Sequence, residues 1–348
     1  MKIRPKISVI VIAYLRKDFI KIALESLYNQ SYPKEFYEII VVKNFIDENI
    51  DNFINANDTK NIYSKSLDLG TKCIEGIENS NGEIIVFLED DDFFYFNKLE
   101  IIDKIFQDDE IVYFHNSHYT VNSVGGLIEG NLFSEFNKEF VLNKYDINYK
   151  KIGKGLKKGI SFNLSSIAIR RSVLLNNLSN LKGMNVAVDN FMFYLALASG
   201  KCLKAAPLRL TFYRVHGNNS SLPSQVGVDV LLSRARSFLE SDLYGYKAIQ
   251  NAVADPFIKN IIECRIIGPK LNLHIINGKI EISKQDYVKA IKCGFAMRNI
   301  ETLILALVDL LSLKFKFLGR NLYVIYLKRK ASLILNSDNI KNQRIISD

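Results

Sequence analysis

The chain opens with short apolar runs that alternate with amphipathic segments. Residues 7–13 are an unbroken, mostly β-branched run, and residues 37–42 and 83–88 repeat this pattern, which is typical of strands covered on both faces. Apolar positions recur at helical spacing over residues 16–29, and residues 66–79 predict a second helix. This strand–helix–strand–helix–strand order predicts right-handed crossovers and a mostly parallel, Rossmann-like sheet flanked by helices.

The character of the pattern changes further along the chain. The middle alternates short strand signals with polar loops, followed by a predicted helix over residues 188–199 and a last strand over residues 208–213. Beyond about residue 225, helical periodicities dominate and strand signals nearly vanish. We therefore predict two domains, an α/β domain over residues 1–225 and an all-α domain over residues 226–348.

Composition narrows the class of protein. The 348 residues are 48% hydrophobic and 24% charged, which is ordinary for a globular protein. No uninterrupted apolar run approaches 18 residues, so we expect no transmembrane helix, and the run at 7–13 is too short for a signal peptide. The four cysteines are scattered without metal-ligand spacing or any sign of a disulfide framework, so we expect a cytoplasmic protein in a reducing compartment.

The positive charge belongs to the C-terminal third. Residues 1–225 carry 27 basic and 26 acidic side chains, whereas residues 226–348 carry 19 and 11. We expect an anionic partner there, and we expect no nucleic acid because the segment lacks the patterns of nucleic-acid modules. Residues 311–335 mix aromatic and basic side chains without a clean stripe, which leaves two interpretations open: core packing, or peripheral attachment to the cytosolic face of a membrane.

Four consecutive carboxylates, residues 89–92, follow directly on the third predicted strand. Packing them together is unfavourable unless a cation neutralises them, and a divalent metal with hard oxygen ligands, shared with a diphosphate, would do so. A solvated acidic turn is the alternative. Their position at the carboxyl edge of a parallel sheet, where ligands bind, favours the metal.

Taken in order, these segments resemble the family 2 glycosyltransferases. The similar segments are SVIVIAY (8–14), ALESLYNQSYP (23–33), YEIIVV (37–42), GEIIVFLEDDD (82–92) and two later stretches at 188–200 and 207–221. The resemblance covers about residues 1–222. It implies a GT-A fold and inverting transfer of a sugar from a nucleotide-sugar donor.

The resemblance also implies roles for individual residues. The acidic cluster matches the family's DXD motif, which holds a divalent metal (Mn²⁺ or Mg²⁺) on the donor diphosphate; Glu89-Asp90-Asp91 is the better register and Asp90–Asp92 the other. Asp189 sits where the family places its catalytic base, although Val188 replaces the usual preceding Glu, and its alternative role is a helix cap or dipole partner. The predicted metal ligands are Asp91, Asp92 and His216, and the predicted donor-binding residues are Ala13, Tyr14, Lys72, Asp90, Asp91 and His216.

Two departures from the family concern the nucleotide. The second strand usually ends with an Asp that reads the nucleobase, but here Lys43 and Asn44 follow it, with Asp47 three residues further on. The family often has an Arg in the helix before the metal strand, and here the nearby cation is Lys72. The identity of the base therefore stays open.

Three further features lie outside the motifs. His115 and His118 have metal-like spacing, but they follow a strand in which alternate residues face opposite sides, so we expect acceptor-site lining or a structural role. Residues 150–158 are rich in Lys and Gly and are either a solvated mobile loop or a lid over an anionic donor. Arg170 or Arg171 is expected near the active site.

The leading prediction is a metal-dependent, inverting glycosyltransferase acting on a hydroxyl of a glycan or lipid-linked acceptor. The alternative is a catalytically silent homologue that binds a nucleotide or glycan. The sugar, the acceptor and the oligomeric state stay open.

Overall fold

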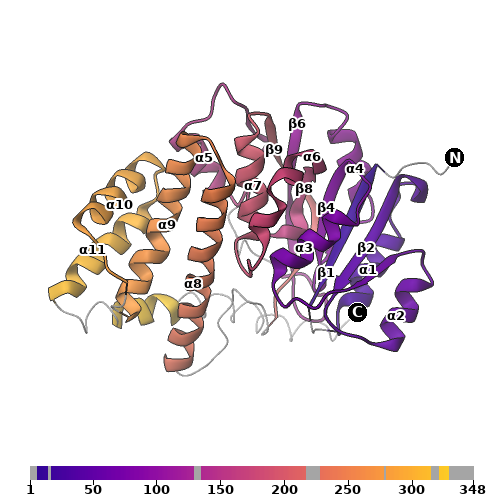
Figure 1. Cartoon of the computed structure of the whole chain (residues 1–348), viewed down its shortest axis with the longest axis horizontal. Coiled ribbons are helices and arrows are strands. Elements are labelled where there is room, and N and C mark those ends of the chain that lie inside the picture. The colour runs from indigo at the N-terminus through magenta and orange to yellow at the C-terminus, as the bar shows by residue number, and fades with distance from the viewer. Residues whose placement is uncertain are drawn as a thin grey trace, which may run out of the picture.

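The computed structural model describes residues 6–14, 17–128, 135–216, 228–277, 280–314 and 321–328. The first part of the chain forms a nine-stranded sheet with helices on both faces, and the later helices form a separate layer at one end (Figure 1). This confirms the predicted fold class, a mostly parallel α/β sheet followed by a helical C-terminal region. The predicted domain boundary near residue 225 lies outside the described residues.

The strands are β1 Ile7–Ala13, β2 Tyr37–Lys43, β3 Lys60–Tyr63, β4 Ile84–Glu89, β5 Phe93–Phe94, β6 Ile111–Val121, β7 Phe140–Leu142, β8 Ile167–Arg170 and β9 Cys202–Arg214. Their order across the sheet is β3-β2-β1-β4-β8-β6-β9-β5, with β7 paired to β9. β1, β2, β3 and β4 run parallel to one another, and β6 is parallel to β9. β8 runs antiparallel between β4 and β6, so the carboxyl ends of β4 and β6 point the same way.

The helices are α1 Ile20–Tyr28, α2 Glu48–Asn55, α3 Leu69–Glu78, α4 Lys98–Ile105, α5 Tyr149–Lys157, α6 Arg171–Leu174, α7 Val188–Ala198, α8 Val228–Ala252, α9 Pro256–Asn277, α10 Lys284–Ala296 and α11 Ile300–Lys314. Residues 321–328 are also helical. One hydrophobic core packs α1 and α4 on one face of the sheet. A second core packs α3 and α7 on the other face and continues into α8 and α9.

Two differences from the sequence-based prediction have local causes. α2 and β3 were not predicted, because β3 is short and none of its residues is fully buried, so it lacks a run of apolar positions. Residues 150–158 are not a loop: α5 covers most of them, because Asn148 accepts a hydrogen bond from the Lys151 N–H and caps the helix. Gly153 fits against the end of α10, where an added Cβ would lie 2.2 Å from the Met297 carbonyl oxygen.

The expectation of no disulfide was wrong. Cys264 in α9 and Cys293 in α10 form a disulfide, with their Cα atoms 5.4 Å apart. The two residues are 29 positions apart in sequence, and only the packing of α9 against α10 brings them together. Among the described residues, no helix has both the length and the apolar character that crossing a membrane requires.

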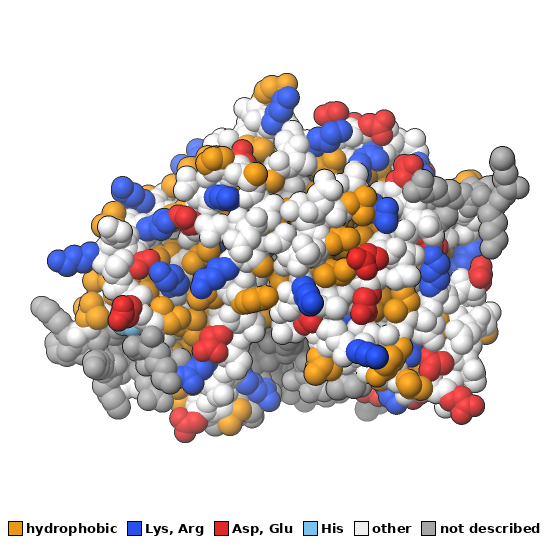
Figure 2. Space-filling model, in the orientation of Figure 1, with side chains coloured by type: hydrophobic (Ala, Val, Ile, Leu, Met, Phe, Trp, Pro, Cys, Tyr) orange, Lys and Arg blue, Asp and Glu red, His pale blue; other side chains and the backbone are white. Residues whose placement is uncertain are grey.

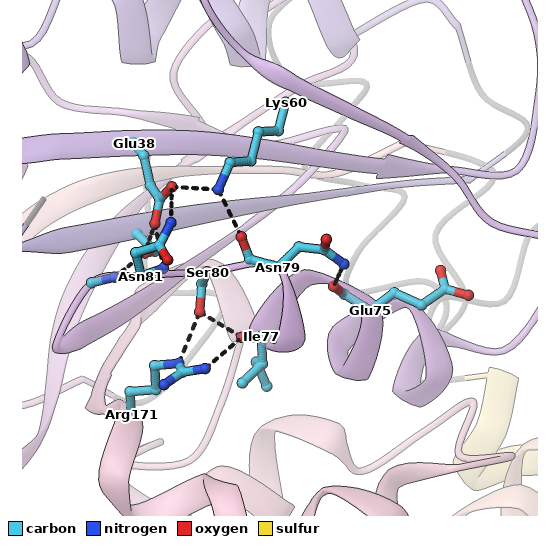
Figure 3. Close-up of polar contacts among 10 residues, drawn as sticks. Glu38, Lys60, Glu75, Ile77, Asn79, Ser80, Asn81 and Arg171 are labelled. Atoms are coloured by element: carbon cyan, nitrogen blue, oxygen red, sulfur yellow. Dashed lines mark hydrogen bonds and ion pairs between the residues drawn. The ribbon is translucent and has the colours of Figure 1, made fainter. Parts of the chain in front are cut away.

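The amino-end edge of the sheet is closed by a polar network (Figure 3). Glu38 of β2 accepts hydrogen bonds from the Ser8 hydroxyl and from Lys60 and Asn81. Arg171 donates to the Ser80 hydroxyl at the end of α3, and the neighbouring Arg170 pairs with Ile84 at the start of β4. Both arginines therefore lie at the edge opposite the acidic motif, and the expectation that one of them lies near the active site was wrong.

Candidate active site

The acidic motif begins where the parallel strands β1 and β4 end together. Ile12 pairs with Glu89, so the residues that follow each strand meet at one edge. The Asp90 N–H donates to the Ile12 carbonyl at 3.2 Å, and the Asp90 carboxylate accepts from the Tyr14 N–H at 2.9 Å. The structure thus brings together three of the predicted donor-binding residues, namely Ala13, Tyr14 and Asp90.

The end of β9 completes this edge from a distant part of the sequence. His216 Nε2 lies 3.0 Å from Asp91 Oδ2. The Arg214 N–H donates to Asp92 Oδ1 at 2.9 Å, and the Arg214 guanidinium donates to the Asp91 carbonyl at 2.8 Å. The predicted metal ligands Asp91, Asp92 and His216 are therefore neighbours.

The carboxylates of this cluster are buried. Asp90, Asp91 and Asp92 are each less than a tenth exposed. Burial, with repulsion from Asp91, raises the pKa of Asp92 to about 8. The attraction of Arg214 opposes this rise.

A second buried cation, Lys98, was missed by the sequence analysis. Its ammonium group donates to the Ser165 carbonyl at 2.6 Å and to the Thr211 hydroxyl at 2.9 Å. Burial lowers the pKa of Lys98 well below its usual value, and the Asp92 carboxylate opposes that fall. Lys98 stands at the start of α4, and a single lysine on an amphipathic helix gives no sequence signal of burial.

The acidic cluster fits a divalent metal that completes its coordination with other ligands. Among the described residues, no three His, Cys, Asp or Glu side chains are grouped closely enough to hold a metal by themselves. However, Asp92 Oδ2 is buried and has no hydrogen-bond partner, and Asp91 and His216 present an oxygen and a nitrogen side by side. Such a mixed set suits Mn²⁺ or Mg²⁺ when diphosphate oxygens and water supply the remaining ligands.

Lys72 and Tyr14 lie next to the acidic cluster. The Lys72 ammonium lies 4.4 Å from the centre of the Tyr14 ring, whose side chain is 40% exposed. Burial lowers the pKa of Lys72 to about 8, and the carboxylates of Asp90 and Asp68 oppose that fall. This places a cation beside the acidic motif, on α3.

The carboxylates near the end of β2 are already engaged in other contacts. Lys43 is turned inward, where its ammonium pairs with Asp51 at 2.7 Å. Asp47 caps α2 by accepting from the Ile50 N–H and pairs with Lys17. Asn44 is only 8% exposed, yet neither its side-chain oxygen nor its nitrogen has a hydrogen-bond partner. An unsatisfied amide therefore occupies this end of the sheet.

Asp189 lies in the first turn of α7. The helix is capped by Ala187, which has a left-handed backbone (φ 65°) and no side-chain capping bond, so Asp189 is not the capping residue. Its carboxylate accepts the backbone N–H of the next residue, Asn190, at 2.7 Å. Burial raises the pKa of Asp189 to about 6, opposed by backbone hydrogen bonds from Asn190 and Asn163.

The segment before β8 connects Asp189 with the acidic motif. Asn163, with φ 68°, contributes one of the backbone bonds to Asp189. Two residues later, the Ser165 hydroxyl accepts the Glu89 N–H at 3.0 Å, and the Ser165 carbonyl accepts from Lys98. A left-handed backbone at a residue other than glycine is costly, and such positions concentrate at functional sites.

His115 and His118 do not face opposite sides, contrary to the prediction. The pairing of β6 with β9 shifts register between Asn116 and Ser117 and again between Ser117 and His118. These irregularities turn both histidines into the wall of one cavity.

Comparison with known proteins agrees with this architecture. Residues 8–178 match the model of glycosyl transferase family 2. Uncharacterised glycosyltransferases of Rickettsia bellii and Rickettsia conorii are 30% and 29% identical over 128 and 142 residues. These matches cover 36% and 37% of this chain but only 18% and 23% of the relatives, so the matched part is about a fifth of their length.

Solved structures share the fold over most of the chain. S. aureus TarS 1–349, in complex with UDP-GlcNAc, has a TM-score of 0.56 at 17% identity and covers 97% of this chain and 90% of its own. The mannosyltransferase PcManGT from Pyrobaculum calidifontis, in complex with GDP-Man and Mn²⁺, has a TM-score of 0.51 at 16% identity, with 94% and 87% covered. The family match identifies residues 8–178 as a glycosyl transferase family 2 segment, and the solved structures show that the chain has a GT-A fold.

Proposed function

We propose that the protein is a metal-dependent, inverting glycosyltransferase that moves a sugar from a nucleotide-sugar donor to a hydroxyl of a glycan or lipid-linked acceptor. The observation that carries this proposal is the edge where Asp91, Asp92 and His216 meet, connected to Asp189 through residues 163–165. The neighbours bound to UDP-GlcNAc and to GDP-Man with Mn²⁺ support a nucleotide-sugar donor and a divalent metal.

The roles follow from the charge that the reaction develops. As the bond from the anomeric carbon to the diphosphate breaks, negative charge grows on the leaving group. The Lys72 ammonium, beside Tyr14 and the acidic motif, would stabilise that charge. A metal with ligands drawn from Asp91, Asp92 and His216 would add Lewis-acid stabilisation of the same oxygens. Asp189 accepts the proton of the acceptor hydroxyl as that oxygen bonds to the anomeric carbon from the opposite face.

Asn44 is assigned to the nucleobase. Its amide offers one donor and one acceptor side by side, and both lack partners at the carboxyl end of β2. Leaving a buried polar group unsatisfied costs about 1–3 kcal/mol. A base edge that presents an adjacent donor and acceptor would satisfy both atoms.

The C-terminal helices support docking on a membrane, because α11 is apolar on its outside. Asp309 and Thr302 point inward, and the Asp309 carboxylate accepts hydrogen bonds from His274 at 2.8 Å and from Tyr287 at 2.7 Å. Ile304 and Leu307, by contrast, are each more than half exposed. A helix on a solvated surface normally has apolar side chains on its inner face and polar side chains on its outer face. Helix α11 has the reverse arrangement.

The neighbouring helix α10 carries exposed basic side chains. Lys284 and Lys292 of α10 are exposed, as is Phe295, and Figure 2 shows basic and hydrophobic groups intermingled over this end of the molecule. We therefore assign the face to an anionic membrane surface, where lysines meet lipid headgroups and apolar side chains enter the interface. Of the basic residues in the segment 311–335, Lys316, Arg320, Arg329 and Lys330 lie outside the described residues.

The test is donor turnover. With UDP-GlcNAc, GDP-mannose and related nucleotide sugars, we expect release of the nucleoside diphosphate that requires Mn²⁺ or Mg²⁺ and stops in excess EDTA. Metal-dependent binding of these donors without release or transfer would instead identify a catalytically silent homologue.

A further inference from the structure

A groove of about 410 Å³ lies where α9 and α10 meet the start of α5, at the helical end of the chain (Figure 1). Its volume is within the range of about 300–1,000 Å³ that is typical of small-molecule sites. Among the described residues that line it are three lysines, Lys284, Lys289 and Lys292, and no carboxylate. Tyr149 and Val288 add apolar surface. This lining suits a small anionic molecule.

The disulfide between Cys264 and Cys293 belongs to the same groove. Both cysteines line it, and they are 8% and 7% exposed. The rate at which a dissolved thiol reduces a disulfide depends on access to the disulfide and on the ionisation of the thiols that take part. Nearby cations favour the ionised thiolate form. The groove therefore combines a route of access for a small thiol with the charge that favours exchange.

Two of the three lysines are available to an anion. Lys289 pairs with Glu263, so its charge is largely compensated. Lys284 and Lys292 are exposed and form no ion pair with any part of the chain that the structure describes. They are about two helical turns apart on α10, and Lys292 directly precedes Cys293. The uncompensated positive charge of the groove therefore lies on the helix that carries one half of the disulfide.

We propose that the groove is a thiol-exchange site, at which a small anionic thiol reduces the disulfide between Cys264 and Cys293. The anionic group of the thiol pairs with Lys284 and Lys292, which raises the local concentration of the thiol at the disulfide. The same positive charge stabilises the thiolates that the exchange uses and releases. The proposal goes beyond the proposed glycosyltransferase function and does not depend on it.

The exchange proceeds in two balanced steps. The thiolate of one small molecule bonds to the sulfur of one cysteine, the sulfur–sulfur bond of the protein breaks, and the other cysteine leaves as a thiolate. A second small thiolate then attacks the small-molecule sulfur of this mixed disulfide and releases the remaining cysteine as a thiolate. The protein disulfide gains two electrons, and the two small thiols lose one each as they join in a disulfide of their own. Their two protons pass through solvent to the two cysteines.

A matched series of thiols tests the role of charge. Mercaptoethanesulfonate, mercaptoethanol and cysteamine share the same short carbon chain and carry a negative, a neutral and a positive group. The rate at which each reduces the folded, full-length protein is divided by its rate with hydroxyethyl disulfide, a neutral reference that corrects for intrinsic reactivity. At low ionic strength we expect this ratio to be about threefold higher or more for the sulfonate than for mercaptoethanol, the scale of the attraction between unit charges about 7 Å apart in water. The ratio for cysteamine should be lower still, and the differences should shrink at high salt. Equal ratios at low salt, or the highest ratio with cysteamine, would overturn the proposal.

Lysine variants locate the effect in the groove. The double variant Lys284→Gln, Lys292→Gln should lose the preference for the sulfonate, whereas Lys247→Gln, at an exposed lysine of α8, should keep it. Differential alkylation read by mass spectrometry follows the two cysteines of the groove separately from the two free cysteines of the chain. A double variant that keeps the preference of the wild type would refute the site, as would a disulfide that none of the three thiols opens while the protein stays folded.

Discussion

At the scale of single residues, Asp189 is the group whose ionisation the reaction depends on. With a pKa of about 6 it is mostly ionised at pH 7, and a general base must be unprotonated. We expect kcat to fall as the pH drops through about 6, and Asp189→Asn to lower kcat by roughly 10²–10⁴ at pH 7. Pre-steady-state transfer assays and donor titrations check this. Loss of donor affinity with an unchanged rate per bound donor would make Asp189 a structural residue.

Ionisation of the Asp189 carboxyl group, which activates the base, lowers the stability of the folded protein. Its pKa is higher in the folded chain than in the unfolded one, so the folded state binds the proton more tightly and loses stability as pH rises through about 4 to 6. Asp189→Asn, which carries no charge, should therefore melt at a higher temperature than the wild type at pH 7, and the difference should shrink toward pH 4. Calorimetry at both pH values measures it. An Asn variant that melts lower at pH 7 would contradict the shift.

Asp91 is proposed to take part in both metal binding and nucleotide binding. Asp91→Asn should abolish turnover and weaken Mn²⁺-dependent nucleotide binding at least tenfold, while the melting temperature stays near that of the wild type. Asp58→Asn is the matched control, because Asp58 is exposed and its left-handed backbone (φ 49°) suits Asn. Full activity of Asp91→Asn would exclude the metal role.

Asn44 allows base recognition to be separated from diphosphate recognition. Asn44→Leu removes the amide donor and acceptor that we propose pair with the nucleobase. UDP or GDP should therefore bind about tenfold more weakly, on the scale of one or two lost hydrogen bonds. Pyrophosphate with Mn²⁺ lacks a base and should bind both proteins equally in calorimetric titrations. A similar loss for pyrophosphate would mean that Asn44 supports the site rather than reads the base.

At the scale of elements, the disulfide between α9 and α10 fastens two helices of the C-terminal layer. Closing a loop of 29 residues is worth about 2–4 kcal/mol of unfolding free energy, so reduction should lower the melting temperature while donor hydrolysis at 25 °C persists. The variant with both Cys264 and Cys293 changed to Ala is the control and should not respond to reductant. If it responds as the wild type does, the stabilisation has another source.

Elements and their ends were largely predictable, whereas cross-strand pairings were not. The run Ile7–Ala13 and the acidic turn were readable because a buried parallel strand is a continuous apolar run and its end is where ligands bind. Lys98 was not, because burial of a lysine depends on groups 67 and 113 residues away. The irregular register of β6, which places His118 beside His115, depends on β9 and leaves no local sequence pattern.

At the scale of the whole molecule, the charged and apolar C-terminal end predicts reversible attachment to anionic vesicles. Each basic residue near the leaflet contributes about 1 kcal/mol, and the attraction fades with salt. Co-sedimentation should require anionic lipid, fall from low to high salt, and drop in the double variant Ile304→Ser, Leu307→Ser. Tyr145→Ser, at another exposed apolar side chain, is the control. Equal recovery in the supernatant with neutral and anionic vesicles at low salt would refute docking.

The contact between Arg214 and Asp92 joins residues 122 positions apart, and this has a consequence during synthesis. A ribosome-bound chain that has emerged only through β8 has its three buried aspartates but neither Arg214 nor His216, and β5 lacks its sheet partner β9. Because unpaired carboxylates resist burial, the acidic turn should stay solvated until β9 enters the sheet. The nascent enzyme therefore gains the ability to act on its donor in one late step, after about 216 residues have left the exit tunnel.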